Sequence, residues 1–211
     1  EFEGDAGGGA LEDAQRLLLG FPVGLPRGLG RRPGRRGRLL GTATVAPASI
    51  ARLARDIDDA RESVHLLYYI FADDARGGQV LAALLRARAR GVECRVLIDA
   101  AGSRQFALAA LLKRLQVAGI PAHEALPAGL FRRGAARFDL RNHRKVAVID
   151  TRVGFTGSQN LVNPGFVPGY PNEELVARVT GPVVLQLQAV FLQDWYFETG
   201  ELPANPEAIE M

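Results

Sequence analysis

The amino-acid sequence predicts an α/β domain, and the main observation is a β-α-β unit. Residues 64–71 form a continuous β-prone run, and residues 79–89 carry leucines at helical spacing. Residues 92–99 form a second β-prone run. Two strands joined by a helix in this way are expected to be parallel, with a right-handed crossover. The chain has 211 residues, of which 47% are hydrophobic, and this is enough for one domain with its own core.

The first part of the chain differs in composition from the rest. Residues 1–41 are rich in Gly, Pro and Arg, so we expect a flexible segment without regular secondary structure. It contains a basic cluster made of Arg31, Arg32, Arg35, Arg36 and Arg38. A solvated linker is the first interpretation. A tether to anionic lipid, where each basic residue contributes about 1 kcal/mol, and contact with nucleic acid are the alternatives.

The folded domain is predicted to span residues 42–200, followed by a loose tail or linker at 201–211. Its first helix is expected over residues 49–60, with Ser49 as N-cap and Asp56 facing solvent. In the strand that follows, His65 is interpreted as a core or edge histidine. The glycines at 77–78 predict a turn before the next helix.

The middle of the chain continues the alternation of helices and strands. Cys94 is expected to be a buried structural cysteine. Asp99 ends its strand either as a structural cap or as a ligand-binding residue at the carboxyl edge of the sheet. A helix over 106–117 and a strand over 120–125 follow, with His123 as an incidental residue.

The last third is predicted to hold a pair of strands around His143 and Gly157. A loop over residues 161–171 then offers exposed apolar candidates, namely Phe166, Val167 and Tyr170. A strand over 175–180 and a helix that opens at Pro182 complete the domain.

Composition limits the classes of partner. The formal net charge of +3 and the pI of about 9.4 permit an anionic partner, whether nucleic acid, anionic lipid or a phosphorylated small molecule. The single cysteine excludes an intramolecular disulfide and a zinc site built from cysteines. No apolar run reaches the length of about 18 residues that spans a bilayer. Because the sequence starts with Glu1, we expect a processed product or a fragment, and an anchor upstream would lie outside it.

The stretch HRKVAVIDTRVGFTGSQN contains most of the candidate catalytic and phosphate-binding residues. His143 and Lys145 lie two residues apart and share one face of an extended strand. Asp150 ends that strand, and Gly157, Ser158 and Asn160 end the next. These residues supply an imidazole, an ammonium, a hydroxyl, a carboxamide and a glycine that lets the backbone approach closely. Such donors are needed around a phosphate with nonbridging oxygens.

Three other interpretations fit these residues less well. A metal site needs further ligands, and Lys145 would repel the cation. A Ser158 nucleophile lacks the G-x-S-x-G turn. A hairpin with incidental polar residues does not explain so many specified identities. Covalent catalysis remains, with neutral His143 attacking phosphorus while Lys145, Ser158 and Asn160 hold the oxygens, and it needs no metal. A carboxylate at the other ring nitrogen would fix the tautomer.

The pattern HRKVAVID…GSQN resembles the HKD motif of the phospholipase D superfamily. The longer stretch RFDLRNHRKVAVIDTRVGFTGSQNLVNPGF is similar to bacterial cardiolipin synthases, as are LLYYIFADD and GPVVLQLQAVFLQDWYFETGE. The resemblance covers about residues 41–201. It implies an α/β/α sandwich with a mixed central sheet, no cofactor, and association with the cytoplasmic face of a membrane.

The resemblance also implies a role for each residue of the motif. His143 would be the nucleophile or a proton donor, and Lys145 and Asn160 would bind phosphate with help from Ser158 and Gly157. Asp150 matches the motif's aspartate, whose role is largely structural. Glu174, with Glu173 as its rival, matches the acidic residue that orients the histidine. The implied reaction is phosphatidyl transfer, in which two phosphatidylglycerol molecules yield cardiolipin and glycerol.

The family's active site uses two such motifs, and this chain supplies one. Of its three histidines, His143 alone is followed by x-Lys. We therefore expect the N-terminal half of a longer protein, or a natural truncation, with the second half-site coming from a missing C-terminal repeat or from a homodimer mate. Two alternatives stay open: a homodimeric phospholipase D-like phosphodiesterase or nuclease, and a catalytically silent truncated domain. Anionic phospholipid is the favoured partner over nucleic acid.

Overall fold

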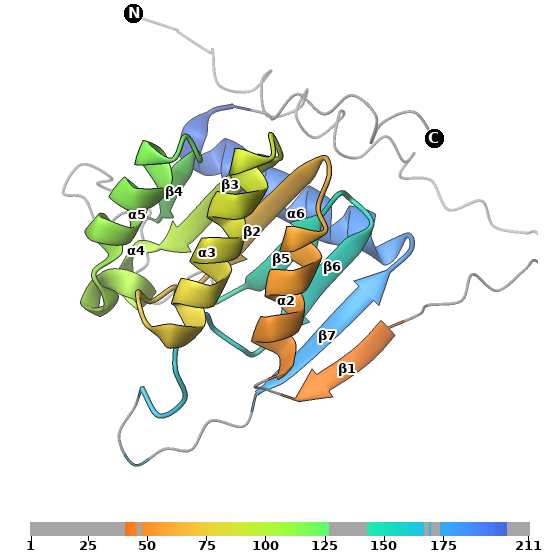
Figure 1. Ribbon diagram of the computed structural model, residues 1–211, viewed down its shortest axis with the longest axis horizontal. Helices are drawn as coiled ribbons and strands as arrows, with labels where there is room; N and C mark the ends of the chain where they lie inside the picture. The colour runs from red at the N-terminus through yellow and green to blue at the C-terminus, as the bar shows by residue number, and fades with distance from the viewer. Residues whose placement is uncertain (1–40, 46–47, 127–142, 167–168, 170–173, 202–211) are drawn as a thin grey trace, which may run out of the picture. The chain divides into compact units, whose positions relative to one another are not determined.

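The computed structural model describes residues 41–45, 48–126, 143–166, 169 and 174–201 (Figure 1). The chain divides into two compact units, residues 1–37 and 38–211, and every described residue belongs to the second. The predicted N-terminal segment up to residue 40 with its arginine cluster, and nearly all of the predicted tail, lie outside the described residues. No helix in the described part is long and apolar enough to cross a bilayer.

Strands and helical segments alternate among the described elements up to residue 125, and three further strands and a last helix follow. The strands are β1 (Gly41–Val45), β2 (Ser63–Tyr68), β3 (Glu93–Asp99), β4 (Ala122–Ala125), β5 (Lys145–Ile149), β6 (Val153–Gly157) and β7 (Leu175–Thr180). The helices are α2 (Ala48–Asp58), α3 (Ala75–Ala89), α4 (Ala100–Ser103), the 3-10 turn η1 (Arg104–Phe106), α5 (Leu108–Val117) and α6 (Val183–Thr199). Strand β1 was not predicted.

The described strands form one mixed sheet in the order β1-β7-β6-β5-β2-β3-β4. Strands β2, β3 and β4 are parallel, which confirms the β-α-β unit. From β2 outward through β5, β6, β7 and β1, each strand is antiparallel to its neighbour. The carboxyl end of β2 therefore meets the amino end of β5.

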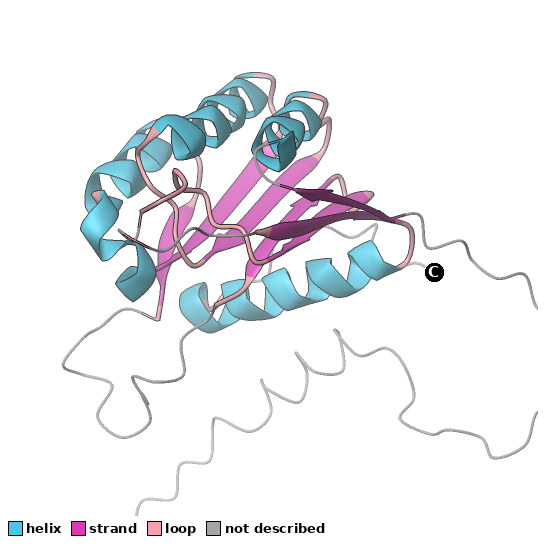
Figure 2. Ribbon diagram, turned by 90° about the horizontal axis from the view of Figure 1, so that it is seen from below, coloured by secondary structure: helices cyan, strands magenta, loops and turns pink. Residues whose placement is uncertain are grey.

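Helices cover both faces of the sheet, so the fold is the α/β/α sandwich that the resemblance implies. Helix α6 lies against one face, and α2, α3 and α5 lie against the other (Figure 2). Each strand contributes side chains to the hydrophobic layers on both sides of the sheet, because successive side chains point to opposite faces. Leu66 packs in the core under α2, α3 and α5, and its neighbour Leu67 packs with Phe191 and Trp195 of α6. Cys94 is buried as predicted, and burial raises the pKa of its thiol to about 12.

The predicted turn at residues 77–78 is wrong, because both glycines lie inside α3. The carboxylate of Asp74 caps this helix by accepting from the backbone N–H groups of Arg76 and Gly77, both at 3.0 Å. A Cβ on Gly77 would lie 1.9 Å from the carbonyl oxygen of Ala72. Glycine is therefore required here for a close tertiary approach and not for a turn.

Helix α2 also differs from its prediction at two polar residues. The helix begins at Ala48, so Ser49 is not its N-cap, and the buried Ser49 hydroxyl donates to the side chain of Gln159. Asp56 is buried and accepts from Arg52 at 3.0 Å and from Arg178 at 2.6 Å. The inner face of α2 is thus attached to β7 through an ion pair.

His65 is a core residue, as predicted. Its side chain is 1% exposed, stacks on Phe191 with ring centroids 4.6 Å apart, and has Nδ1 3.1 Å from Oε1 of Gln188. No described group is a hydrogen-bond partner of Nε2. Burial therefore lowers the pKa of His65 from 6.5 to about 4.

This burial predicts a pH-dependent stability. Between pH 6.5 and 4 the unfolded chain binds a proton at His65 that the folded chain does not bind, so the free energy of unfolding falls as the pH is lowered. The expected loss is about 3 kcal/mol, complete near pH 4, and the full stability is present above pH 6.5. Urea unfolding of the wild type and of His65→Met at each pH measures it. The two stabilities should converge as the pH falls, and a constant difference would show that His65 does not titrate on unfolding.

Candidate active site

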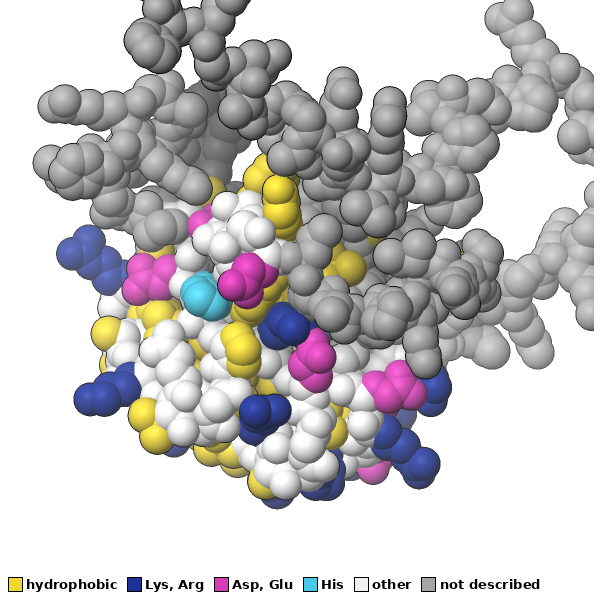
Figure 3. Space-filling model, turned by 90° about the horizontal axis from the view of Figure 1, so that it is seen from above, with side chains coloured by type: hydrophobic (Ala, Val, Ile, Leu, Met, Phe, Trp, Pro, Cys, Tyr) yellow, Lys and Arg dark blue, Asp and Glu magenta, His cyan; other side chains and the backbone are white. Residues whose placement is uncertain are grey.

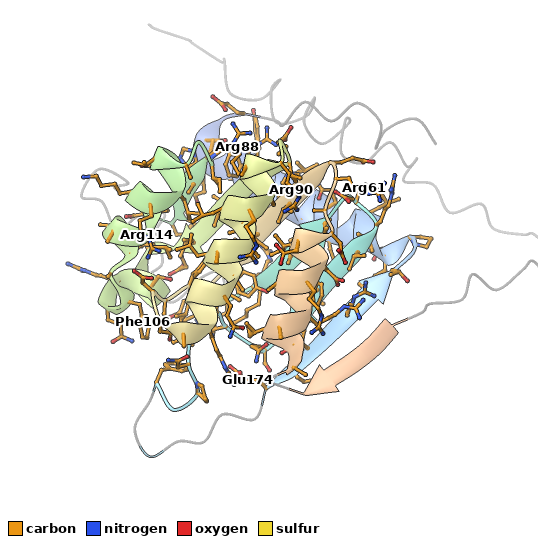
Figure 4. The ribbon with its side chains drawn as sticks, in the orientation of Figure 1. Arg61, Arg88, Arg90, Phe106, Arg114 and Glu174 are labelled. Carbon is orange, nitrogen blue, oxygen red and sulfur yellow. The ribbon has the colours of Figure 1, made fainter. Side chains whose placement is uncertain are left out.

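The motif residues, except Asp150, gather at the end of the domain where β2 ends and where β5 and β7 begin. Tyr68, the last residue of β2, lies opposite Lys145, the first residue of β5. In Figure 4, the labelled Glu174 and Phe106 lie at this lower end, whereas Arg61, Arg88 and Arg90 lie at the upper end. Ligands of open α/β sheets bind at the carboxyl edge of the parallel strands, and this is that edge.

His143 is exposed and lies against an aromatic platform. Its imidazole stacks on the ring of Tyr69, with centroids 4.0 Å apart and planes inclined by 19°. Tyr69 directly follows β2, so the strand holds the platform in place. The stack fixes the plane of the imidazole while leaving the side chain accessible, as a nucleophile that meets a bulky substrate requires.

Lys145 is held beside His143. Its ammonium donates to the carbonyl oxygen of His143 at 2.7 Å and lies 5.3 Å from the centroid of the Tyr69 ring. Partial burial lowers the pKa of Lys145, and the negative charge of Glu174 acts in the opposite direction. The ammonium is thus a partly desolvated cation, which interacts more strongly with a phosphate oxygen than one in bulk water.

Glu174 is held by a buried polar network. Its Oε2 accepts from Nε2 of Gln159 at 3.0 Å and lies 3.5 Å from the guanidinium of Arg76. Gln159 in turn accepts from Ser49. These partners place the carboxylate where it acts electrostatically on Lys145, and the predicted role of orienting His143 stays a prediction. The rival Glu173 lies outside the described residues.

Gly157 and Ser158 attach the end of β6 to β7. A Cβ on Gly157 would lie 2.1 Å from the carbonyl oxygen of Leu175, so the two backbones are in close contact here. The Ser158 hydroxyl accepts from the Leu175 N–H at 2.9 Å, and the Ser158 N–H donates to the Leu175 carbonyl, also at 2.9 Å. Ser158 remains exposed. Its hydroxyl proton can therefore turn from the Leu175 carbonyl, 3.4 Å away, to a bound oxyanion.

Asn160 lies deeper, with 8% of its surface exposed. Its Oδ1 accepts from the backbone N–H of Ile70 at 3.0 Å. This bond fixes the amide so that the Nδ2 group remains as a donor. Asn160 thus connects the motif to the same segment after β2 that carries Tyr69.

Asp150 lies at the opposite end of β5 from Lys145. Its carboxylate accepts from the N–H groups of Arg61, Glu62 and Ser63 at 2.8 to 3.2 Å, where β2 begins. Asp150 has a φ of 50°, a backbone region that aspartate adopts more readily than most residues. This geometry agrees with a structural role for the motif's aspartate.

Replacing Asp150 with alanine is expected to lower the free energy of unfolding by about 2 kcal/mol, because three backbone donors lose a charged acceptor. Asp150→Asn keeps one acceptor oxygen and tolerates the positive φ, so about half of that loss is expected. Chemical denaturation of both variants tests the difference. Equal stability of Asp150→Ala and the wild type would contradict the structural role.

The sequence did not identify three residues of the site: Tyr69, Gln159 and Arg76. Tyr69 directly follows β2 and Asp99 is the last residue of β3, and this shared position at the carboxyl edge was the available signal. Gln159 is the variable position of the G-S-x-N motif. Asp99 itself caps α4, accepting from the N–H groups of Ala101 and Gly102 at 2.9 and 2.8 Å, which supports the structural interpretation.

Known proteins of the phospholipase D type resemble this chain in both sequence and fold. A cardiolipin synthase A from Pectobacterium carotovorum is 39% identical over 180 residues, which are 82% of this chain and 37% of the relative. One from Yersinia pseudotuberculosis is 38% identical over 181 residues, again 37% of its length. The chain thus spans little more than a third of these curated relatives.

Solved structures show the same fold. Nuc from Salmonella typhimurium, a phospholipase D family member, superposes with a TM-score of 0.58 at 21% identity, covering 78% of this chain and 97% of Nuc. NucT from Helicobacter pylori gives 0.54 at 20% identity, covering 75% and 96%.

A family model described as the phospholipase D-like domain of cardiolipin synthase matches residues 53–195. This range holds every motif residue from His143 to Glu174. The chain therefore belongs to the cardiolipin synthase family of phospholipase D-like domains.

Proposed function

We propose that this chain carries one half-site of a phosphatidyltransferase that makes cardiolipin from phosphatidylglycerol. The observation that carries the proposal is the arrangement of His143, stacked on Tyr69 and held next to the ammonium of Lys145. A nucleophile and a cation for phosphate oxygens therefore lie side by side at the ligand-binding edge of the sheet.

In the first half-reaction, a ring nitrogen of His143 attacks phosphorus of phosphatidylglycerol. The P–N bond forms, the P–O bond to the headgroup glycerol breaks, and the leaving oxygen takes a proton from the second half-site. Lys145, Ser158 and Asn160 donate to the nonbridging oxygens, whose negative charge grows in the transition state. In the second half-reaction, the hydroxyl oxygen of another phosphatidylglycerol attacks phosphorus, loses its proton to a base, and the P–N bond breaks.

The proposal requires a second histidine as proton donor. That residue comes from a C-terminal repeat of a longer protein or from a second copy of this chain. The match to little more than a third of the curated relatives leaves room for a repeat in those proteins. We place the active chain at the cytoplasmic face of a membrane, where its lipid substrate lies.

A homodimeric phosphodiesterase of the same superfamily is the second candidate. It is favoured by the fold match that covers 97% of Nuc, a chain of similar extent. Figure 3 shows the end of the described domain opposite the candidate active site, where basic and acidic side chains are interspersed. The product formed therefore decides between the two candidates.

Product analysis separates the candidates. The 211-residue chain is incubated, over a range of concentrations, with labelled phosphatidylglycerol in vesicles and separately with DNA. Cardiolipin and glycerol in equal amounts support the transferase, and a rate that rises with the square of chain concentration indicates a dimeric site. DNA cleavage without lipid turnover supports the phosphodiesterase. If neither substrate reacts and the chain is a monomer in solution, this chain by itself is catalytically silent.

A further inference from the structure

A cleft with a volume of about 620 Å³ opens beside the candidate active site. It lies between the segment after β2, the α4–η1 region and the loop that carries Phe166. Its lining residues are Tyr69, Ile70, Ala101, Gly102, Arg104, Gln105 and Phe166. None of them belongs to the HKD motif, and none has a role in the reaction as described above except Tyr69.

Tyr69 joins the cleft to the active site. Its ring lines the cleft and also stacks on the imidazole of His143. Gly102 makes this position possible, because a Cβ there would lie 2.8 Å from two ring carbons of Tyr69 and 2.4 Å from its carbonyl oxygen. The backbone of α4 thus packs directly on Tyr69. A molecule in the cleft would therefore contact the residue on which His143 stacks.

The walls of the cleft combine apolar surface with one cation. Phe166 packs edge-on against Phe106 with ring centroids 6.2 Å apart, next to the buried Ile70. Arg104 is exposed, and no carboxylate in the described part of the chain forms an ion pair with it. An apolar wall and an unpaired guanidinium suit an amphiphile with a phosphate group, because the guanidinium forms bidentate hydrogen bonds with phosphate.

We propose that this cleft binds the second phosphatidylglycerol, the acceptor, with its phosphate on Arg104 and its apolar part against Tyr69, Ile70 and Phe166. The inference rests on the proposed transferase function. The acceptor must bring its glycerol hydroxyl to phosphorus at His143, while its own phosphate stays one glycerol unit away. His143, which stacks on Tyr69, and Arg104, which lines the cleft together with Tyr69, provide two anion-binding positions for the two phosphates of the product.

Occupancy of the cleft then decides which product forms. When the acceptor is bound, its hydroxyl oxygen attacks phosphorus, the P–N bond to His143 breaks, and cardiolipin leaves. When water attacks in its place, the same bond breaks and phosphatidic acid leaves. Loss of acceptor binding is therefore expected to lower transfer more than hydrolysis.

The first test is Arg104→Gln, assayed for the ratio of cardiolipin to phosphatidic acid. A charged hydrogen-bond partner is removed, so the ratio is expected to fall on the order of tenfold. Arg55→Gln is the matched control, because Arg55 is an exposed arginine on α2 with no ion pair among the described residues. Its ratio should equal that of the wild type. Equal losses of both products in Arg104→Gln would overturn the acceptor assignment.

The second test measures binding without turnover. His143→Asn, with and without Arg104→Gln, is titrated with dihexanoyl phosphatidylglycerol below its micelle concentration and followed by NMR. Arg104→Gln is expected to raise Kd on the order of tenfold. If the wild type makes no cardiolipin, this chain has no transferase activity by itself, and this titration alone decides the cleft. An unchanged Kd in Arg104→Gln, read from the NMR signals of the residues that line the cleft, would overturn the site.

Discussion

Replacing His143 with asparagine is expected to abolish covalent labelling of the chain by phosphatidylglycerol and to lower transfer by at least about 10³-fold. Asparagine retains a polar side chain on the Tyr69 platform but has no ring nitrogen that can attack phosphorus. Lys145, Ser158 and Asn160 remain, so phosphate binding should persist while chemistry stops. The measurement is labelling with lipid that carries radioactive phosphorus, followed by denaturation and electrophoresis.

The chemical stability of the label identifies the bond. A phosphorus–nitrogen bond to imidazole hydrolyses in acid and survives in alkali, whereas a phosphoserine ester shows the opposite behaviour. This distinguishes His143 from Ser158 as the nucleophile. The matched control is His123→Asn, because His123 is also exposed but lies on β4 against the edge of Trp195. Retained acid-labile label in His143→Asn, or its loss in His123→Asn, would contradict the assignment.

The sequence predicted those elements whose pattern of apolar residues reflects how many of their faces are buried. Strands β2 and β3 are apolar runs because helices cover both faces of the sheet, whereas α3 and α5 carry leucines at helical spacing because one face of each helix packs on the sheet. The error at residues 77–78 has a different origin. A sequence does not reveal that Gly77 is needed because the Ala72 carbonyl lies where its Cβ would be. Only the tertiary contact distinguishes this glycine from a turn residue.

The candidate site also has residues that the sequence predicted and residues that it did not. His143, Lys145, Ser158 and Asn160 were identified because two neighbouring antiparallel strands bring short, regularly spaced motifs to one edge of a sheet. The supporting residues come from distant segments. Arg76 lies in the first turn of α3 and contacts Glu174 directly, and Ser49 lies in the first turn of α2 and is connected to Glu174 through Gln159. No spacing within a single stretch encodes such a network, since it depends on how the helices pack on the sheet.

Replacing Gly157 with alanine is expected to lower the free energy of unfolding by about 3 kcal/mol or more. The new Cβ would lie 2.1 Å from the Leu175 carbonyl oxygen and 3.0 Å from the Val176 Cα, and a φ of 154° is a conformation that residues with a side chain rarely adopt. Both obstacles are backbone, so no side-chain rotation can relieve the contact. Urea unfolding at neutral pH measures the loss, with the slope m checking that the transition remains two-state.

The same substitution at Gly78 is the control, and its expected sign is opposite. Gly78 lies inside α3, and no atom lies within 4 Å of the position of its Cβ. Gly78→Ala should therefore stabilise the chain by about 0.5 to 1 kcal/mol, since alanine has the higher helix propensity. For Gly157→Ala, a further loss of transfer per folded molecule is expected, because pushing Leu175 away displaces the Ser158 hydroxyl that bonds to its N–H. If Gly157→Ala were as stable as Gly78→Ala, the close approach of β6 and β7 could not be what positions the Ser158 hydroxyl.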